Sequence, residues 1–185
     1  MKILEWIKNK LSFNKEETVD CVIAVAIPKQ KPIVHCYCES PELVPVKAHG
    51  TDSGYDLFAK EEMTIMPNQW TLVPTGVFIK IENKDKSHNI ELQIRPKSGL
   101  ASKKGLSILN TPGTVDQGYT GEICVIAINH GVYPYVIEKH TKIAQAVFAY
   151  VPIVDMKFVD KEEFNKLSET ADRGADGFGS TGLKK

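Results

Sequence analysis

The stretch Asn110-Thr-Pro-Gly-Thr-Val-Asp-Gln-Gly-Tyr-Thr-Gly-Glu122, followed by an apolar run over residues 123–128, decides the fold. Its first part holds three glycines and a proline, residue types that favour turns. The apolar run is rich in β-branched residues, which favour a pleated, half-buried strand. The stretch therefore predicts a glycine-rich hairpin that leads directly into a buried β-strand.

Similar runs occur on both sides of this stretch and share a high content of β-branched and aromatic residues. The expected strands cover residues 70–73, 77–81, 90–94, 123–128, 135–137 and 144–151. Gly, Pro, Asn and Asp separate them, as in Asn83-Lys-Asp85 and Asn129-His-Gly131. Many short strands at roughly even spacing predict an all-β sandwich or jelly roll. One helix is expected inside this region, over residues 98–104.

The two ends of the chain differ from this β-rich region. Residues 1–16 carry apolar side chains at helical spacing, which predicts a short amphipathic helix, docked on its own protein or lying on a membrane surface. An apolar run at 21–27 and a Pro-containing linker at 28–32 follow. From residue 170 the chain is rich in Gly, Asp and Ser, as in mobile arms. We expect an N-terminal extension (1–30), a β core (31–168) and a flexible C-terminal arm (169–185).

The composition is that of an ordinary globular protein. Of the 185 residues, 42% are hydrophobic and 25% charged, and the formal net charge is zero. A zero net charge argues against binding long nucleic acids, whose phosphates require a basic surface. The four cysteines form no Cys-x-x-Cys pair, which disfavours zinc, and we expect them to be small buried apolar side chains. This cysteine usage, with no apolar run long enough for a signal or membrane span, favours a reducing, cytoplasmic location.

Five clusters carry side chains suited to chemistry, and they occupy residues 50–59, 95–101, 110–122, 142–145 and 173–182. The last combines four glycines with Arg173, Phe178, Ser180 and Thr181. Backbone N–H groups, hydroxyls and a guanidinium can hold phosphate, and a phenyl ring can stack on a base. A glycine-rich tail without a role is the alternative for this segment.

The other clusters each have an ordinary structural explanation. Asp116 is a candidate general base, or a turn residue satisfied by local backbone. Asp56 can orient metal-bound water, or simply end a turn. Ser98 offers a hydroxyl to an anion, or caps a helix. Gln145, within an apolar strand, needs a hydrogen-bond partner that can be structural.

Taken together and in this order, the five clusters resemble the five motifs of the trimeric dUTPase family. The most specific strings are Arg95-Pro-x-Ser-Gly-Leu-Ala101, Pro112-Gly-Thr-Val-Asp-x-x-Tyr-x-Gly-Glu122 and Gly177-Phe-Gly-Ser-Thr-Gly182. The resemblance implies a β jelly roll of the β-clip type and a homotrimer with three active sites at subunit interfaces. It implies hydrolysis of dUTP to dUMP and pyrophosphate, which keeps uracil out of DNA and supplies dUMP for thymidylate synthesis.

The resemblance also implies a role for each matched residue. Asp116 would activate the water that attacks the α-phosphorus. The hairpin would read uracil, and Tyr119 would lie against the deoxyribose. Mg²⁺ would be held by the phosphates and water, with Asp56 as an outer-shell partner. The implied substrate-binding residues are Lys97, Ser98, Gly99, Asn110, Gly113, Thr114, Val115, Tyr119, Gln145, Arg173, Phe178, Gly179, Ser180 and Thr181.

Three of the five motifs depart from the family pattern. Lys97 stands where the second motif usually has Arg, and Gly118 replaces an acidic residue of the third motif. The fourth motif usually begins Gly-Asp-Arg, and here it reads His140-Thr-Lys142. Lysine keeps the charge of arginine but loses its bidentate geometry.

Two other functions are alternatives to dUTP hydrolysis. The related dCTP deaminases carry an Arg where this chain has Ser102 and a catalytic Glu near the position of Ile126. An aliphatic side chain cannot move the protons that deamination requires. A regulatory protein that binds a partner through residues 1–30 is the second alternative, and the retained Asp116 argues against a loss of catalysis.

Overall fold

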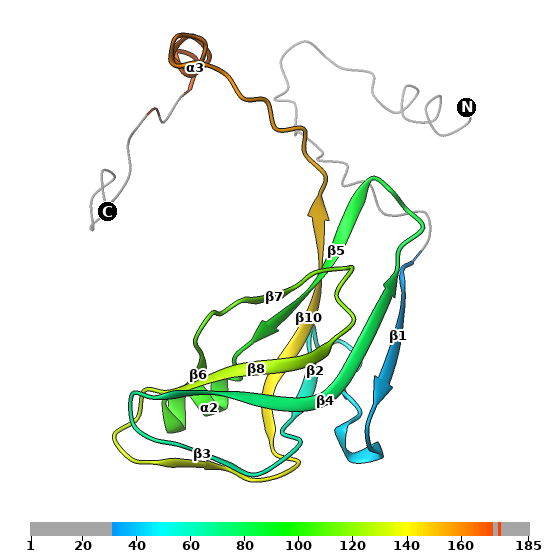
Figure 1. The fold of residues 1–185 in the computed structure, drawn as a ribbon, viewed down its shortest axis with the longest axis vertical. Helices are drawn as coiled ribbons and strands as arrows, with labels where there is room; N and C mark the ends of the chain where they lie inside the picture. The colour runs from blue at the N-terminus through cyan, green and yellow to red at the C-terminus, as the bar shows by residue number, and fades with distance from the viewer. Residues whose placement is uncertain (1–30, 172–173, 175–185) are drawn as a thin grey trace, which may run out of the picture. The chain divides into compact units, whose positions relative to one another are not determined.

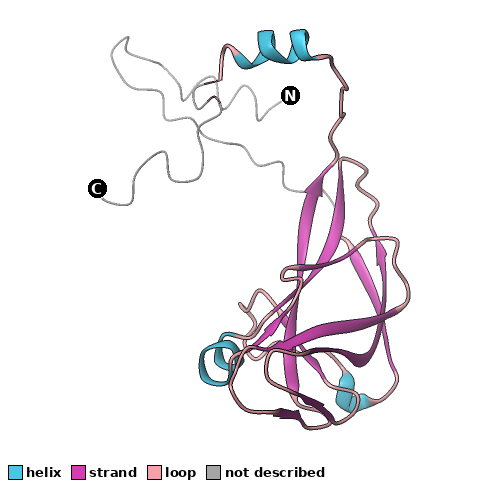
Figure 2. Ribbon diagram, turned by 60° about the vertical axis from the view of Figure 1, so that its left-hand side comes forward, coloured by secondary structure: helices cyan, strands magenta, loops and turns pink. Residues whose placement is uncertain are grey.

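The computed structural model describes residues 31–171 and Gly174. Two four-stranded antiparallel sheets and one two-stranded sheet form its body (Figures 1 and 2). The first sheet has the order β1 (Ile33–Cys38), β4 (Trp70–Glu82), β8 (Glu122–Asn129), β6 (Leu106–Ile108). The second has the order β2 (Tyr55–Phe58), β10 (Lys142–Pro152), β5 (His88–Arg95), β7 (Gly113–Val115). The third pairs β3 (Met63–Ile65) with β9 (Tyr135–Ile137).

The core consists of aliphatic side chains from both large sheets. Val73 and Val125 of the first sheet and Leu57 and Leu92 of the second are at most 1% exposed. Burial of each such side chain contributes about 1.5–3 kcal/mol to stability. The predicted all-β sandwich is therefore confirmed, and the predicted strand over residues 123–128 is present as β8, an inner strand of the first sheet.

The predicted break between residues 73 and 77 was wrong. β4 runs as one strand through Pro74 and Gly76, with a register shift against β8 between Pro74 and Phe78. A bulge tolerates a proline because it leaves a residue outside the regular ladder. The Thr75 hydroxyl donates to the Ile123 carbonyl at 2.5 Å. Gly76 has φ of 65°, a conformation that glycine adopts without strain. The bulge thus replaces the expected turn.

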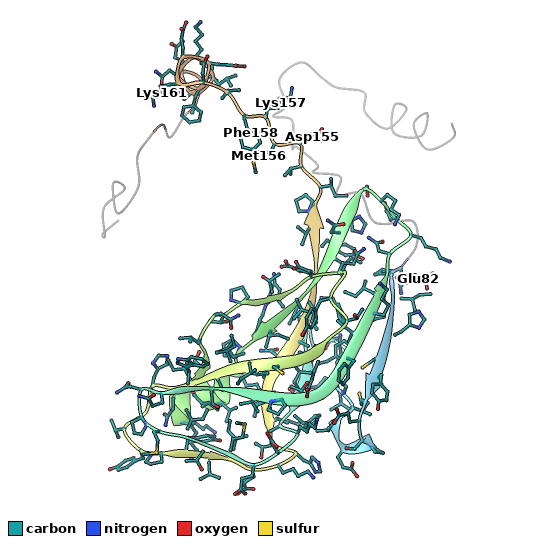
Figure 3. The ribbon with its side chains drawn as sticks, in the orientation of Figure 1. Glu82, Asp155, Met156, Lys157, Phe158 and Lys161 are labelled. Atoms are coloured by element: carbon teal, nitrogen blue, oxygen red, sulfur yellow. The ribbon has the colours of Figure 1, made fainter. Side chains whose placement is uncertain are left out.

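The helices confirm one prediction and add another element. α2 spans Ser98–Lys104, as predicted. α3 spans Lys161–Ser168 and was not predicted, although its N-cap Asp160 accepts a hydrogen bond from Glu163 N at 2.9 Å. An acidic cap with Glu three residues later is typical of helix starts. An extended segment containing Asp155, Met156, Lys157 and Phe158 links β10 to α3 (Figure 3). A one-turn 3-10 helix, η1 (Pro41–Leu43), follows β1.

The expectation of buried cysteines was wrong for the cysteines that the structure describes. Cys36 is exposed, and Cys38 and Cys124 are half-buried. Cys36 and Cys38 lie on β1, an edge strand with a neighbour on one side only, so part of their surface stays uncovered. The predicted helix at 1–16, the apolar run at 21–27 and nearly all of the predicted C-terminal arm lie outside the described residues. No helix within residues 31–171 is long and apolar enough to cross a membrane.

Candidate active site

The stretch predicted as a hairpin around Asp116 forms β7 and the turn that follows it, but β7 and β8 belong to different sheets and do not pair, so the predicted two-stranded hairpin was wrong. We keep the name hairpin for residues 110–122. β7 pairs with β5, with Gly113 opposite Ile94 and Val115 opposite Leu92. On the other side, Leu109 N donates to the Ile126 carbonyl of β8 at 2.9 Å. The hairpin is therefore held between strands of both large sheets.

This hairpin lines a pocket of about 360 Å³, called here the hairpin pocket. Its polar wall comes from the hairpin itself, and its apolar wall comes from β4, β5, β6 and β8. Asp116 and Tyr119 lie in the wall and are both exposed. The full lining is Leu72, Ile94, Ile108, Asn110, Gly113, Thr114, Val115, Asp116, Tyr119, Glu122, Ile123, Cys124 and Ile126.

Close contacts fix the shape of the hairpin pocket. A Cβ on Gly113 would lie 3.1 Å from Nδ2 of Asn110, so a larger residue would crowd that amide. The Tyr119 hydroxyl donates to the Glu122 carbonyl at 3.0 Å. Gln117, the residue after Asp116, accepts a hydrogen bond from Ile90 N at 3.0 Å through its Oε1. This hydrogen bond links the residue after Asp116 to β5.

A second group of predicted residues gathers at the β2–β10–β5 strands, around Asp56. The Lys97 ammonium donates to Oδ1 of Asp56, and the Lys142 ammonium lies 2.8 Å from Oδ2. The Asp56 side chain is only 10% exposed, against 28% for Lys97 and 46% for Lys142. We call Asp56, Lys97 and Lys142 the lysine–aspartate cluster.

The two ammonium groups determine the charge state of the cluster. Burial alone would raise the pKa of Asp56, but hydrogen bonds from Lys142 and Lys97 outweigh it, so the pKa of Asp56 lies below its ordinary value. Asp56 is therefore ionised at neutral pH. One carboxylate and two ammonium groups leave a formal charge of +1 in this cluster.

Gln145 lies beside the cluster, opposite Asp56 on one side and Arg95 on the other. Its Nε2 donates to the Pro96 carbonyl at 3.0 Å. The side chain of Gln145 thus has the structural hydrogen-bond partner that was one of the two expected possibilities. A Cβ on Gly54 would lie 2.7 Å from Gln145 Oε1 and 3.0 Å from Gln145 Cβ. Because Gly54 has no side chain, it leaves room for the side chain of Gln145.

Ser98 and Gly99 begin α2 next to the cluster and are both exposed. The N-cap residue is Lys97, not Ser98, and it makes no side-chain capping bond. Helix capping therefore does not explain Ser98. Arg95, two residues before Lys97, turns to Gln93 and donates from Nε to its Oε1 at 2.9 Å.

The residues of the lysine–aspartate cluster do not fit a metal cage. Among residues 31–171 and Gly174, no group of three or more His, Cys, Asp or Glu could hold a metal ion. Asp56, predicted as an outer-shell partner of Mg²⁺, already accepts from two ammonium groups. Mg²⁺ usually keeps several waters and takes few protein carboxylates alongside substrate phosphates. A bound Mg²⁺ would therefore depend on phosphate oxygens and water here.

Cys36 of β1 does not supply a nucleophile. The Sγ atoms of Cys36 and Cys38 lie 3.6 Å apart. Burial and the hydrogen bond with Cys38 raise the pKa of the Cys36 thiol to about 11. The thiolate is the reactive form of cysteine, so Cys36 is unreactive at neutral pH.

The structure thus brings the predicted residues together in two groups. Asn110, Gly113, Thr114, Val115, Asp116 and Tyr119 share the hairpin pocket. Asp56, Lys97, Ser98, Gly99 and Gln145 do not line it. Arg173, Phe178, Gly179, Ser180 and Thr181 lie outside the described residues. The sequence prediction missed two charged side chains in these groups, Glu122 in the pocket wall and Lys142 on Asp56.

Comparisons with known proteins identify the family of the chain. The sequence profile of the dUTPase family matches residues 42–182. The deoxyuridine 5'-triphosphate nucleotidohydrolase of Gloeothece citriformis is 48% identical over 145 residues, which cover 78% of this chain and 92% of the relative. A mutant dUTPase of Staphylococcus bacteriophage 80alpha, solved with dUpNHpp, has a TM-score of 0.67 and 26% identity, covering 82% of this chain and 99% of that one.

The fold also matches a mutant dUTPase from phage phi11 of S. aureus, whose structure describes coordination of a structural Mg(II) ion. That likeness has a TM-score of 0.61 at 22% identity, over 70% of this chain and 97% of the other. The profile match spans both groups of candidate site residues, and the first relative is similar over nearly its whole length. The chain belongs to the dUTPase family.

Proposed function

We propose that this protein hydrolyses dUTP to dUMP and pyrophosphate through attack of water on the α-phosphorus. The observation that carries the proposal is the hairpin pocket, which presents Asp116 and Tyr119 together in one wall, inside a chain of the dUTPase family. Membership of the family alone would leave open whether the catalytic groups are retained. In this chain both are present and face the same space.

In this reaction Asp116 accepts a proton from the attacking water. General-base assistance of this kind contributes about 10²–10⁴ in rate. An ordinary aspartate is a weak base, with a pKa of about 4, so its value lies in holding the water in line with the departing pyrophosphate. The hydrogen bond from Ile90 N of β5 to Gln117 supports this role, because it holds the residue next to Asp116 in place.

The hairpin pocket selects the base and the sugar. Uracil would meet Asn110 and the backbone of Gly113, Thr114 and Val115, with the Tyr119 ring against the deoxyribose. Cytosine presents a reversed pattern of donors and acceptors, and a site built for the other pattern can reject it by about 10⁴-fold. The tight contact between Gly113 and Asn110 supports a closely fitted pocket.

The triphosphate would lie along the second group of residues. Lys97, Ser98 and Gly99 would contact phosphate oxygens, with Gln145 beside the attacking water. Arg173, Phe178, Gly179, Ser180 and Thr181 would close over the phosphates and the base. Mg²⁺, when bound to the phosphates, supplies charge neutralisation for the leaving pyrophosphate, and Asp56 remains at most an outer-shell partner.

We propose further that the site is completed in a homotrimer, with the two groups of residues meeting across subunit interfaces. Within one chain the hairpin pocket does not include Lys97 or Gln145. Apolar side chains in and beside the pocket are uncovered, with Leu72 of its wall 51% exposed and Trp70 of β4 59% exposed. Such exposed apolar surface is typical of an interaction site, and a closed homo-oligomer would bury it.

Deamination of dCTP is disfavoured by a specific observation. Ile126, at the position expected for the catalytic Glu of the deaminases, lies in the wall of the hairpin pocket. Its side chain carries no group that can transfer a proton.

Pyrophosphate release tests the proposed function. We would follow it with dUTP, and with dCTP, dTTP and UTP as controls, for the natural chain and for Asp116→Asn. The expected result is release from dUTP alone, reduced on the order of 10²-fold or more in kcat by the substitution because the water loses its base. Ammonia release from dCTP would replace this proposal with deamination. Inertness toward every nucleotide would leave partner binding as the function.

A further inference from the structure

The lysine–aspartate cluster has one more cation than its carboxylate needs. Lys97 contacts one oxygen of Asp56 and Lys142 contacts the other, at 2.8 Å. A single ammonium group would neutralise Asp56. The second therefore requires an explanation beyond charge balance in the free protein.

The two lysines are held in different ways. Lys142 begins β10, the strand that pairs with β2, which carries Asp56. The backbone just before Lys142 is also fastened to the end of β2, because Ala59 N donates to the Thr141 carbonyl at 2.9 Å and His140 N donates to the Ala59 carbonyl at 2.8 Å. Lys97, by contrast, precedes α2 and follows the end of β5. Lys142 and Asp56 thus belong to two paired strands, whereas Lys97 comes from the start of α2, where its carbonyl accepts from Leu100 N and Ala101 N at 3.0 Å.

This difference matters when Lys97 contacts a phosphate. To reach an anion, its ammonium must leave the carboxylate of Asp56, which is 10% exposed. Removing the only partner of a buried charge is strongly unfavourable, because the remaining charge is uncompensated. Lys142 prevents this penalty, since it stays on the other oxygen of Asp56. The ion pair of Lys97 can then be exchanged for a substrate phosphate at low cost.

We propose that Lys142 is a positioning residue for triphosphate binding, which keeps Asp56 neutralised and so releases Lys97 to the substrate. The inference rests on the proposed role of Lys97 as a phosphate-binding residue. It gives Asp56 a function as an anchor for two lysines, in place of the outer-shell metal role expected from the sequence. Lys142 itself touches neither substrate nor reacting atoms in this account.

A double-mutant cycle between Lys142 and Asp56 tests the proposal. In the natural background, Lys142→Met should raise KM for dUTP about tenfold and change kcat less than about twofold, because Lys97 is then the only partner of Asp56. Lys142→Arg should restore KM, since it returns the charge. In the Asp56→Asn background, Lys142→Met should change KM less than about twofold, because no carboxylate remains to be neutralised.

A control variant and a measurement of folding accompany this double-mutant cycle. Lys80→Met removes an exposed lysine of β4 and should leave KM unchanged, and melting temperatures show whether each variant is folded. An equal rise in KM for Lys142→Met in both backgrounds would overturn the proposal, since Lys142 would then act on the substrate directly. An unchanged KM in the natural background would also overturn it.

A binding measurement separates this inference from the proposed function. The same cycle is built in the Asp116→Asn chain, and the Kd of dUTP is measured by calorimetry. If the natural chain releases no pyrophosphate but Kd follows the expected pattern, the proposed hydrolysis fails and the role of Lys142 stands. If Lys97→Met leaves the Kd of dUTP unchanged, Lys97 is not the phosphate-binding cation, and the inference about Lys142 fails with it.

Discussion

The hairpin pocket and the lysine–aspartate cluster are held together by different kinds of contact. The pocket is shaped by a glycine-rich turn against apolar side chains, and its one charged candidate for catalysis, Asp116, is exposed. The cluster is built from ion pairs around a buried carboxylate, with Gln145 fitted against Gly54. If the proposed function holds, base recognition depends on shape, whereas phosphate binding depends on charges that are already balanced in the free protein.

Among substitutions that change only one of the two regions, Gly54→Ala is expected to lower activity the most. The added Cβ would lie 3.0 Å from Gln145 Cβ as well as 2.7 Å from Oε1, so rotation of the glutamine side chain alone cannot relieve the crowding. Gln145 should lose its hydrogen bond to Pro96, and a misplacement of about 1 Å at such a site can cost about 10²-fold in rate. We expect kcat/KM for dUTP to fall by about that factor in steady-state assays.

Gly50→Ala is the matched control for this prediction. No atom lies within 4 Å of the position that its Cβ would occupy, so its kcat/KM should stay close to that of the natural chain. Equal losses in both variants would show that the glycine-rich segment before β2 acts through folding and not through Gln145.

A smaller effect, of a different kind, is expected from Gly113→Ala in the hairpin pocket. The new Cβ would lie 3.1 Å from Asn110 Nδ2, which forces the amide to shift by a few tenths of an ångström. Base recognition should weaken, so KM for dUTP should rise about tenfold while kcat changes little. Gly118→Ala lies in the same hairpin with open space around its Cβ, and its KM should be unchanged. A fall in kcat without a rise in KM would assign Gly113 to catalysis instead.

The sequence predicted those elements whose information is local. β9 and α2 have the predicted limits, because each is bounded by residues that favour turns or caps. β4 was divided in two because Pro74 and Gly76 favour a turn, and only the pairing with β8 turns them into a bulge. α3 was missed although Asp160 and Glu163 form a recognisable helix start.

The same distinction between local and long-range information holds for the residues of the site. The hairpin residues are contiguous in sequence, and six of them were predicted and line one pocket. Lys142 was noted only as a departure from the family pattern. Its contact with Asp56 depends on the register of β2 against β10, and that of Lys97 joins residues 41 positions apart. No local pattern reports such a contact.

We propose that the two regions belong to one active site formed by different copies of the chain, and mixed trimers test this directly. Co-expression of Asp116→Asn and Gln145→Ala chains with different tags, followed by purification on both tags, yields mixed trimers only. If each site takes its hairpin from one chain and Gln145 from a neighbour, about one site in three is intact in every mixed trimer. Mixed trimers of two inactive chains should therefore release pyrophosphate at about a third of the natural rate. A mixed assembly as inactive as its parents would contradict this proposal and place the whole site within a single chain.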